Sequence, residues 1–566
     1  MSPPVRAEAV QAADRNLAGA VFCLLFAVYL ATFSGLPENP DAEVEFQSTS
    51  ALVRTRSLAL GGTPEAEAIV GLVHQGRQGF NVRRGGPGRE HEAFSWSGIG
   101  QPLVAVPLYL AGSLAAHLFP ALEQRHHGST HLGVARSEYF EHLFVGLRNP
   151  LLGALTGALL VLAARRAGAR RVHAVLCGLT YGLCSYAWPQ ARGTLSDVQA
   201  TAALFLAFVL AESVLERLRS ARTPPLATLV GFGLALGLAF LTRPVLAPGV
   251  AVLALFFLVR VRQEARATAR AFPLREFAAG LLPALACLAL ALWVNRSRFG
   301  EALEFGYGGV VGTEWFLRPP WEGLLGVTLS PGSGLLWFAP GMLLALPCFV
   351  HALRRREYAL PGLLVALVLA LGVPLVLIPS WHGAWSYGPR YLLPLLPFLW
   401  FPLGVSLDWV WERTLPRVLA CALFVLGGIT ALGGVLVEYN TNLDLSLQAA
   451  GLEWPPAPGL DPNHDEANFV RAKFDPRFAA PWAHWRIFRQ RLAGRGERFA
   501  VRELYFLERD EIIEPSWERW LGFRHSAWVD LHQRLGGPLW PAFVSCGLLL
   551  LASRLLFVRA RDADTA

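Results

Sequence analysis

The chain has 566 residues, of which 53% are hydrophobic and only 16% are charged, and its mean hydropathy is +0.39. Soluble proteins carry roughly 25% charged residues, and a chain with 34 Phe and 18 Trp is too hydrophobic to be disordered. The net charge is +8, and it comes from Arg, because Lys473 is the single lysine. This composition indicates a polytopic membrane protein with Arg-rich cytoplasmic loops, and it disfavours a nucleic-acid-binding protein.

Apolar stretches of about 17–25 residues predict membrane-spanning helices. About twelve are expected, at residues 17–36, 143–164, 172–188, 195–215, 226–241, 245–259, 277–294, 335–350, 360–378, 391–410, 418–437 and 539–558. The loops expected to stay in the cytoplasm are the Arg-rich ones, at residues 165–171, 216–222, 260–275 and 354–356. The alternate loops then face outward, and both termini lie in the cytoplasm.

A further apolar helix is expected at residues 99–119, but it cannot cross the membrane. The first span leads outward, and the span that ends at the Arg-rich loop 165–171 leads inward, so a crossing between them would break the count. Pro102 and Pro107 also fit a juxtamembrane or re-entrant helix on the outer side. The predicted fold class is therefore an all-α polytopic membrane protein of about 12 transmembrane helices with an outer juxtamembrane helix.

The charge and hydropathy pattern divides the chain into three parts. Residues 1–437 are expected to form the transmembrane domain, with a first outer loop at 37–142. Residues 438–538 are predicted to form a small periplasmic, that is extracytoplasmic, region, because this polar segment is long enough for a small domain. Residues 539–566 contain the last transmembrane helix and a cytoplasmic tail.

The segment directly after the first span, residues 38–46, reads Glu-Asn-Pro-Asp-Ala-Glu-Val-Glu-Phe. Asp41, Glu43 and Glu45 alternate there, so they share one side of a strand or surround one turn of a helix. Carboxylates at a membrane surface can deprotonate an acceptor or hold a metal. The same residues also suit the start of a helix over residues 42–60, with Asp41 as its cap. Both interpretations stay open at this point.

A second acidic position lies at the next outer turn. Residues 189–198 place Arg192 and Asp197 at the outer end of a span. Ser196 and Asp197 suit a cap on the following helix, and Asp197 suits an outward cleft equally well. Arg243 lies at another tight outer turn and offers a cation on the same side.

The outer loop at residues 379–391 gathers aromatic and basic side chains, namely Trp381, His382, Trp385, Tyr387, Arg390 and Tyr391. Aromatic rings alone would fit an interfacial belt, but a belt needs neither the histidine nor the arginine. A guanidinium suits a phosphate, and aromatic faces suit the CH surfaces of sugars. The residues predicted to bind the donor phosphate or the substrate are Arg243, Arg390, His382, Tyr387, Trp381 and Arg192.

In this order, the motifs resemble those of the GT-C superfamily of integral-membrane glycosyltransferases, which includes the protein O-mannosyltransferases and the lipid A aminoarabinose transferases. The matching positions are the acidic residues after the first span, Asp197, and the helix opening at residues 98–109, which is similar to the juxtamembrane helix of the family. The resemblance covers roughly residues 10–440. The chain departs from the family where Ala42 separates Asp41 from Glu43, and where the juxtamembrane lysine of some members is missing.

The resemblance implies a sugar donor linked to a polyprenyl phosphate. Asp41 is the first choice for the general base, with Glu43 and Glu45 as alternatives. Arg390 or Arg243 would stabilise the departing lipid phosphate. Asp197 would orient the acceptor or a cation. The motifs require no cofactor, and a divalent metal, whose ligands are unknown, is the one candidate.

The leading hypothesis is an inverting glycosyltransferase of a bacterial inner membrane, which transfers a hexosyl or pentosyl group at the outer face to a hydroxyl of a glycan, lipid or protein. No nucleic acid is expected as a partner. The alternatives are a transporter or flippase of glycan lipids and a non-catalytic membrane subunit. A transporter is expected to show repeated halves, and the sequence shows no internal repeat. The enzyme hypothesis predicts that four charged residues converge on one outward cavity, namely Asp41, Asp197, Arg243 and Arg390.

Overall fold

The computed structural model describes residues 3–75, 81–127, 130–131, 134–135, 137–220, 222–267, 274–306, 319–354, 358–383, 386–455, 466–494, 498–515 and 527–565. Within these ranges the chain is mostly helical. Its strands form three antiparallel pairs, which are β1 (Val82–Arg84) with β2 (Ala93–Ser95), β3 (Thr130–His131) with β4 (Val134–Ala135), and β5 (Phe499–Ala500) with β6 (Ile512–Ile513). The predicted all-α membrane fold class is confirmed.

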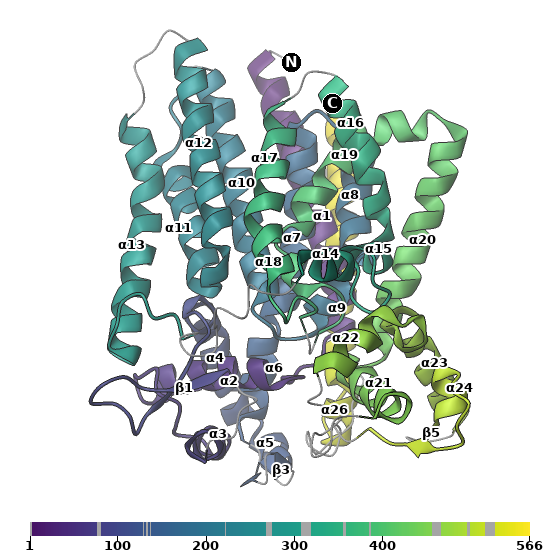
Figure 1. Cartoon of the computed structure of the whole chain (residues 1–566). Coiled ribbons are helices and arrows are strands. Elements are labelled where there is room, and N and C mark those ends of the chain that lie inside the picture. The colour runs from purple at the N-terminus through teal and green to yellow at the C-terminus, as the bar shows by residue number, and fades with distance from the viewer. Residues whose placement is uncertain are drawn as a thin grey trace.

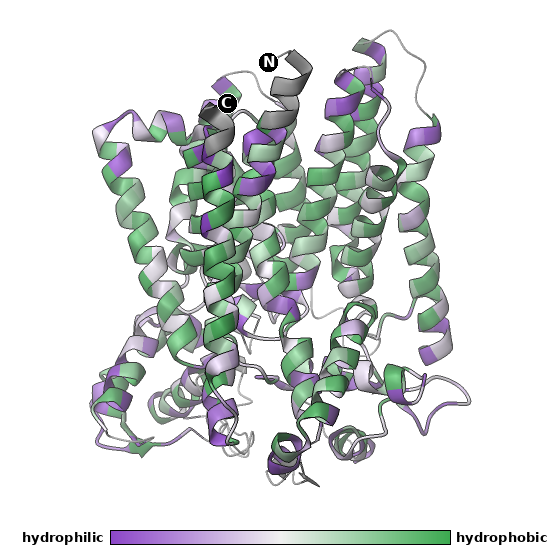
Figure 2. Cartoon of the chain, turned by 180° about the vertical axis from the view of Figure 1, so that it is seen from behind, coloured by the Kyte–Doolittle hydropathy of each residue, from purple (hydrophilic) through white to green (hydrophobic). Residues whose placement is uncertain are grey.

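Apolar helices of differing length stand side by side and form the upper part of the molecule (Figure 1). They are α1 (Pro3–Thr32), α7 (Arg148–Arg166), α8 (Arg171–Leu183), α10 (Asp197–Arg219), α11 (Leu226–Thr242), α12 (Ala247–Ala267), α13 (Leu274–Phe299), α16 (Ala345–Arg354), α17 (Ala359–Leu367), α19 (Leu396–Trp411), α20 (Thr414–Leu436) and α27 (Trp540–Thr565). Figure 2 shows that these helices are hydrophobic along most of their length and hydrophilic toward their upper ends. This banding is the one that a lipid bilayer selects.

Short helical elements connect or extend the upright helices. They are α9 (Ala187–Arg192), η1 (Pro244–Leu246), α14 (Pro320–Thr328), α15 (Leu335–Phe338), η3 (Pro340–Leu344), the π-helical turn η4 (Val368–Gly372), α18 (Val373–Leu377) and η5 (Arg390–Leu392). Two of these turns, η1 and η5, begin at or next to arginines that the sequence analysis singled out.

The predicted spans agree with most of the upright helices. In the part of the chain that the structure describes, nine helices are long and apolar enough to cross a membrane, and all of them except α4 coincide with predicted spans. The remaining predicted spans correspond to shorter helices, namely α8 (13 residues), α11 (17 residues), α19 (16 residues) and the interrupted series α15–η3–α16. The chain is a multi-pass membrane protein, and the count of about twelve crossings stays a prediction.

A lower layer of shorter helices covers one end of the bundle (Figure 1). It contains α2 (Pro40–Arg54), α3 (Pro64–His74), α4 (Gly100–Leu118), α5 (Pro120–His127), α6 (Tyr139–Gly146), α21 (Tyr439–Glu453), α22 (Glu466–Phe474), η7 (Pro476–Phe478), α23 (Ala480–Leu492), α24 (Val501–Tyr505) and α26 (Trp528–Arg534). Figure 1 shows α4 in this layer, beside α2 and α6, and not among the upright helices. That position agrees with the predicted juxtamembrane helix.

The described parts of the Arg-rich loops lie at the end of the bundle where the chain also begins and ends. Arg165, near the end of α7, pairs with Asp14 of α1, with 2.7 Å between Nε and Oδ1. Arg219, at the end of α10, pairs with Glu264 of α12, with 2.8 Å between Nε and Oε1. Figure 1 shows the N- and C-termini together at the upper end, opposite the lower layer. The two classes of loop that the charge pattern separated therefore occupy opposite ends of the molecule.

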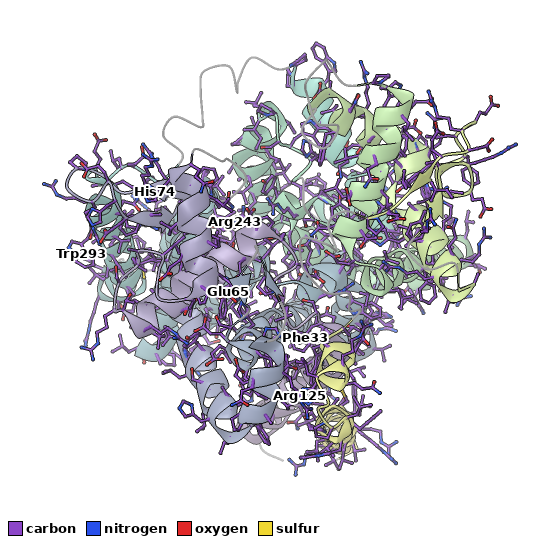
Figure 3. The ribbon with its side chains drawn as sticks, turned by 90° about the horizontal axis from the view of Figure 1, so that it is seen from below. Phe33, Glu65, His74, Arg125, Arg243 and Trp293 are labelled. Carbon is purple, nitrogen blue, oxygen red and sulfur yellow. The ribbon has the colours of Figure 1, made fainter. Side chains whose placement is uncertain are left out.

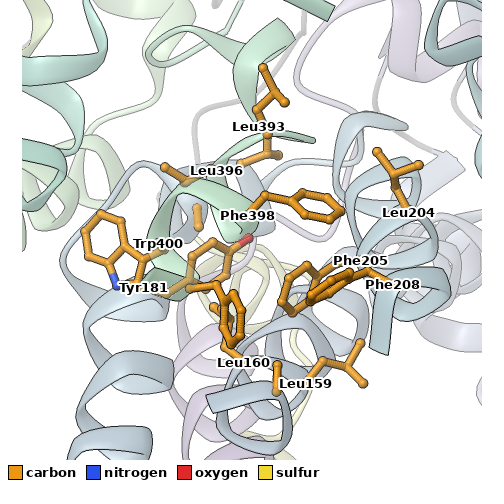
Figure 4. Packing of buried hydrophobic residues seen from close by; sticks show 14 of the residues in the cluster. Leu159, Leu160, Tyr181, Leu204, Phe205, Phe208, Leu393, Leu396, Phe398 and Trp400 are labelled. Atoms are coloured by element: carbon orange, nitrogen blue, oxygen red, sulfur yellow. The ribbon is translucent and has the colours of Figure 1, made fainter. Parts of the chain in front are cut away.

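The core of the bundle is formed by aromatic and aliphatic side chains from α7, α8, α10 and α19 (Figure 4). Phe398 packs edge to face against Phe205, with ring centroids 5.1 Å apart, and against Phe208 at 5.6 Å. Trp400 is buried and donates from Nε1 to Oγ1 of Thr180 at 3.2 Å. This packing fixes α19, and α19 follows directly on the turn that carries Arg390.

The region at residues 438–538 has a hydrophobic cluster of its own, centred on buried residues such as Ile487 and Leu504. It is also joined to the bundle. Trp485 of α23 donates from Nε1 to the carbonyl of Ile429 in α20 at 3.2 Å. The backbone N–H of Trp528 donates to the carbonyl of Phe33 at 3.0 Å. These contacts hold α23 and α26 against the lower end of the bundle.

Candidate active site

Helix α2 carries the acidic residues and begins at Pro40. Asn39 has extended backbone angles, and its Oδ1 accepts a hydrogen bond from the backbone N–H of Ala42 at 2.8 Å, so Asn39 is the N-cap. Pro40 suits the first helical position, where a backbone N–H would have no helical partner. The prediction that Asp41 caps this helix is therefore wrong. The carboxyl of Asp41 is left to contact other elements.

Asp41 and Glu43 point toward different elements, because side chains two positions apart in a helix are rotated by about 200° around its axis. Oδ2 of Asp41 lies 3.6 Å from Nη2 of Arg390, and 21% of the Asp41 side chain is exposed. Glu43 is only 3% exposed, and its Oε2 lies 3.4 Å from Nε2 of His142 in α6. The structure therefore places Glu43 away from Asp41, in contact with α6, and leaves Asp41 as the more accessible carboxylate.

Glu45 lies one helical turn after Asp41, on the same face of α2. It is buried, and the positive charge of Arg148 acts on its carboxyl. Burial raises the pKa of Glu45 to about 7, and the charge of Arg148 opposes that shift. Burial also raises the pKa of Asp41, against the lowering effect of Arg390 and then of Arg243.

The pH dependence of stability tests the burial of Glu45. Its pKa is about 7 in the folded chain against an ordinary value of 4.5, so folding favours the protonated form. This contribution is complete below the ordinary pKa and is lost as the pH rises through 7. Glu45→Gln is expected to remove up to about 3 kcal/mol of this pH dependence. Unfolding followed by Trp fluorescence between about pH 4.5 and pH 7 measures it, and an unchanged slope would contradict the assignment.

Asp197 begins α10 and makes an ion pair with Arg243, which lies at the turn between α11 and η1. The predicted cap is not formed, since the N-cap residue Ser196 makes no side-chain hydrogen bond to the helix. Asp197 is buried. Gln199 donates from Nε2 to the carbonyl of Gly100 at 2.9 Å and to Oγ1 of Thr242 at 2.8 Å. The ion pair is therefore held where α4, α10 and α11 meet.

The residues at the start of α4, Gly98-Ile99-Gly100, allow the backbones of α4 and α11 to approach closely. A Cβ at Gly98 would lie 2.0 Å from the carbonyl oxygen of Leu241, and one at Gly100 would lie 2.5 Å from the backbone nitrogen of Thr242. Only glycine permits so close an approach of two backbones. The start of α4 thereby fixes the end of α11, which carries Arg243.

Tyr391 lies between the two arginines of the site. Its ring centroid is 4.9 Å from Cζ of Arg390 and 5.5 Å from Cζ of Arg243, which are distances for cation–π contacts. Nη2 of Arg390 also donates to the Tyr391 hydroxyl at 3.1 Å. Gly383 has a φ of +67°, and a Cβ there would lie 2.9 Å from Cγ of Arg390. The loop before η5 therefore packs tightly on the Arg390 side chain.

The structure brings the four charged residues of the enzyme hypothesis together. The charges of Arg390, Arg243 and Asp197 are close enough to Asp41 to shift the pKa of its carboxyl. Nε of Arg390 and Oδ2 of Asp197 are buried and have no hydrogen-bond partner within the described residues. Figure 3, seen from below, shows Arg243 well inside the outline of the lower face, whereas Trp293 lies at its edge. The structure therefore shows one charged cluster at the lower end of the bundle, formed by the carboxylates of Asp41 and Asp197 and the guanidiniums of Arg243 and Arg390.

Arg192 lies in a neighbouring pocket. Its Nη2 is 3.0 Å from Oε1 of Glu38, and its Nη1 donates to the carbonyl of Val435 at 2.8 Å. Arg192 is buried, and the pocket that it lines also contains Asn39 and Tyr439. Arg192 therefore links the segment before α2 to the end of α20.

The aromatic residues of the loop at 379–391 are divided between several neighbours. Trp381 donates from Nε1 to Oε1 of Glu322 at 3.2 Å, and His382 stacks on Phe469 of α22, with centroids 4.4 Å apart. The hydroxyl of Tyr387 donates to the carbonyl of Thr430 in α20 at 2.7 Å. Trp381 also packs on Phe474 of α22, with ring centroids 5.7 Å apart, so all three residues contact α20 or α22. Trp385 lies outside the described residues.

Several residues at the site were missed by the sequence analysis. Asn81 is hydrogen-bonded to the carboxyl of Asp41, and Glu38 pairs with Arg192. Tyr439 and Lys473, both from the C-terminal region, line a further pocket. Of these residues, only Lys473 stood out in the sequence, because it is the single lysine. Among the described residues, no group of three or more His, Cys, Asp or Glu is arranged to hold a metal ion.

No protein-family model matches this chain, and no curated protein matches it in sequence. Among solved structures, the chain is similar to ArnT from Cupriavidus metallidurans in the apo state, with 17% identity and a TM-score of 0.44 over 96% of this chain and 75% of that chain. ArnT bound to undecaprenyl phosphate gives 15% identity and a TM-score of 0.42 over 96% and 76%. The archaeal oligosaccharyltransferase AglB from Archaeoglobus fulgidus, in complex with an inhibitory peptide and a dolichol-phosphate, gives 12% identity and a TM-score of 0.37 over 83% and 63%. In each comparison the chain is similar to the solved structure over most of its own length.

Proposed function

We propose that this protein is an inverting glycosyltransferase that transfers a sugar from a polyprenyl-phosphate-linked donor to an acceptor hydroxyl. The observation that carries the proposal is the contact of Asp41 with Arg390 beside the Asp197–Arg243 pair. Such a site offers a partly exposed carboxylate to take a proton and cations to receive a phosphate. Undecaprenyl phosphate and dolichol-phosphate, which are bound in two of the similar structures, are lipids of the proposed donor class.

In the proposed reaction, Asp41 accepts the proton of the acceptor hydroxyl. The acceptor oxygen forms a bond to the anomeric carbon as the bond from that carbon to the phosphate oxygen breaks. Attack from the face opposite the phosphate inverts the anomeric configuration. The burial that raises the pKa of Asp41 strengthens it as a base, while Arg390 keeps it ionised.

The electron pair of the breaking bond goes to the polyprenyl phosphate, which gains negative charge. A guanidinium near that oxygen stabilises the charge as it develops. Arg390 is the first candidate, because its Nε has no hydrogen-bond partner in the described part of the chain, and Arg243 is the second. Asp197 would orient the acceptor hydroxyl or a divalent cation beside Asp41.

The site lies at the end of the bundle opposite the Arg-rich loops. Positive loops stay in the cytoplasm, so the proposed reaction takes place at the outer face of a bacterial inner membrane, with both termini in the cytoplasm. In this arrangement residues 438–538 form an extracytoplasmic region that closes one side of the site, and residues 539–566 return the chain to the cytoplasm.

Transfer in reconstituted vesicles tests the proposal. Purified protein is supplied with a panel of radiolabelled polyprenyl-phosphate sugars and with an envelope fraction as acceptor. We expect label to move from lipid to acceptor with the anomeric configuration inverted, and protein-free vesicles provide the control. A product of retained configuration would contradict the mechanism. Movement of the intact labelled lipid between leaflets without transfer would favour a flippase instead.

A further inference from the structure

Lys473, in α22, is the single lysine of the chain, and its side chain is only 5% exposed. Burial lowers the pKa of its ammonium to about 7. Nζ is hydrogen-bonded to the hydroxyl of Tyr439 and lies 5.2 Å from the ring centroids of both Tyr439 and Phe469. In the described ranges, no carboxylate is paired with this amine. A lysine on an ordinary protein surface extends its amine into water, whereas the amine of Lys473 is buried.

The pocket around Lys473 has more hydrogen-bond donors than acceptors. The oxygen of Tyr439 accepts from Nζ, which leaves the Tyr439 O–H and the two other N–H groups of Nζ to donate. Asn442 lines the same pocket, and its Oδ1 accepts from the hydroxyl of Tyr505 at 3.2 Å. No hydrogen bond of the described chain uses the Nδ2 of Asn442. Positive charge surrounded by unused donors is the arrangement that binds an oxyanion.

The backbone around Lys473 is held in place. The N–H of Gly332, in the loop between α14 and α15, donates to the Lys473 carbonyl at 2.9 Å. A Cβ at Gly332 would lie 2.8 Å from Cα of Lys473, so only glycine allows this loop to approach α22 so closely. The amine is therefore placed by packing on both sides of the pocket.

We infer that Lys473, Tyr439 and Asn442 form an oxyanion-binding site that takes a phosphate group, either as the soluble ion or as a lipid headgroup. The site shares no residue with the Asp41–Arg390 contact, and its test does not depend on the transfer reaction. Tyr439 connects the two regions, because it also lines the pocket that contains Arg192 and Glu38. A phosphate at Lys473 would supply the negative partner that the buried ammonium lacks.

The single lysine makes the test direct. Full-length protein labelled with lysine that carries ¹³C at Cε gives one lysine side-chain resonance in detergent micelles, without assignment. We expect inorganic phosphate at neutral pH to move this resonance saturably toward its protonated position. Sodium chloride at the same ionic strength is the control for screening. An equal response to chloride, or no response to either phosphate source, would overturn the proposal.

A second probe distinguishes the two sources of phosphate. If decyl phosphate in the micelle saturates the resonance at less than about a tenth of the inorganic phosphate concentration, the occupant is a lipid headgroup. If decyl phosphate and inorganic phosphate saturate the resonance at equal concentrations, the occupant is the soluble ion.

Two variants separate a built site from general attraction. Tyr439→Phe keeps the ring and is expected to weaken phosphate binding about tenfold or more, since it removes a hydrogen bond to a charged group. Arg471→Met removes an exposed charge from the same helix and is expected to leave binding within about twofold. Equal weakening by both variants would contradict a site built around Lys473.

Discussion

Replacing Asp41 with asparagine is expected to lower the rate of sugar transfer by about two to four orders of magnitude, the usual contribution of a positioned general base. The amide keeps the size of the side chain but cannot accept the acceptor proton. Asp41 is the most exposed carboxylate of α2 and the one in contact with Arg390, so the loss should fall on turnover more than on donor binding. Initial rates in vesicles at several donor concentrations measure both quantities.

Glu43→Gln is the matched control for Asp41→Asn. It makes the same chemical change on the same helix, two residues away, but Glu43 contacts His142 of α6. Its transfer rate should fall far less than that of Asp41→Asn, because Glu43 is buried beside His142 and does not contact Arg390. Wild-type transfer by Asp41→Asn, or equal losses in both variants, would refute Asp41 as the base.

Replacing Arg243 with methionine is expected to destabilise the fold by about 3–5 kcal/mol. The cause is Asp197, which is 1% exposed and would remain as a buried carboxylate without this cation. The double variant Asp197→Asn with Arg243→Met removes both charges and should be more stable than Arg243→Met alone by at least about 1 kcal/mol. Denaturant unfolding in detergent, followed by Trp fluorescence, measures these two variants and the single variant Asp197→Asn.

The surface pair of Arg219 and Glu264 provides the comparison for this experiment. Arg219 is 41% exposed, so Arg219→Met should cost less than about 1 kcal/mol. If Arg243→Met costs no more than Arg219→Met, the Asp197–Arg243 pair does not stabilise the site. A double variant that is less stable than either single change would also count against the pair.

Much of the architecture could be predicted from the sequence because it depends on hydropathy and on the position of arginines. The bilayer selects long apolar helices, and the Arg-rich loops separate the two ends of the bundle. The count of crossings alone required the helix at 99–119 to stay outside the bundle, where α4 lies. The residues of the site also lay in the outer loops that the charge pattern identified.

The orientation of individual side chains could not be predicted in the same way. Asp41, Glu43 and Glu45 occupy one short segment, and only the helical conformation separates Glu43 from the other two. The Asn39-Pro40 pair was a readable signal for the helix start and showed that Asp41 was not the cap. The contact of Asp41 with Arg390 joins residues far apart in the chain and depends on how α19 packs in the core. No local pattern specifies it.

The first and last helices are neighbours, and this has a consequence for how the protein is made. The buried residues Ala13, Ala20 and Ala27 lie seven apart on α1, where Ser553 of α27 donates to the carbonyl of Ala20 at 2.8 Å. Since Ala20 and Ser553 are separated by 533 residues, a ribosome needs roughly 30 to 100 seconds between them. Throughout that interval the alanine face of α1 must be covered by lipid or by an insertion factor. In the proposed orientation, residues 438–538 are exported before α27 exists, so the bundle closes around its first helix only after this region has crossed the membrane.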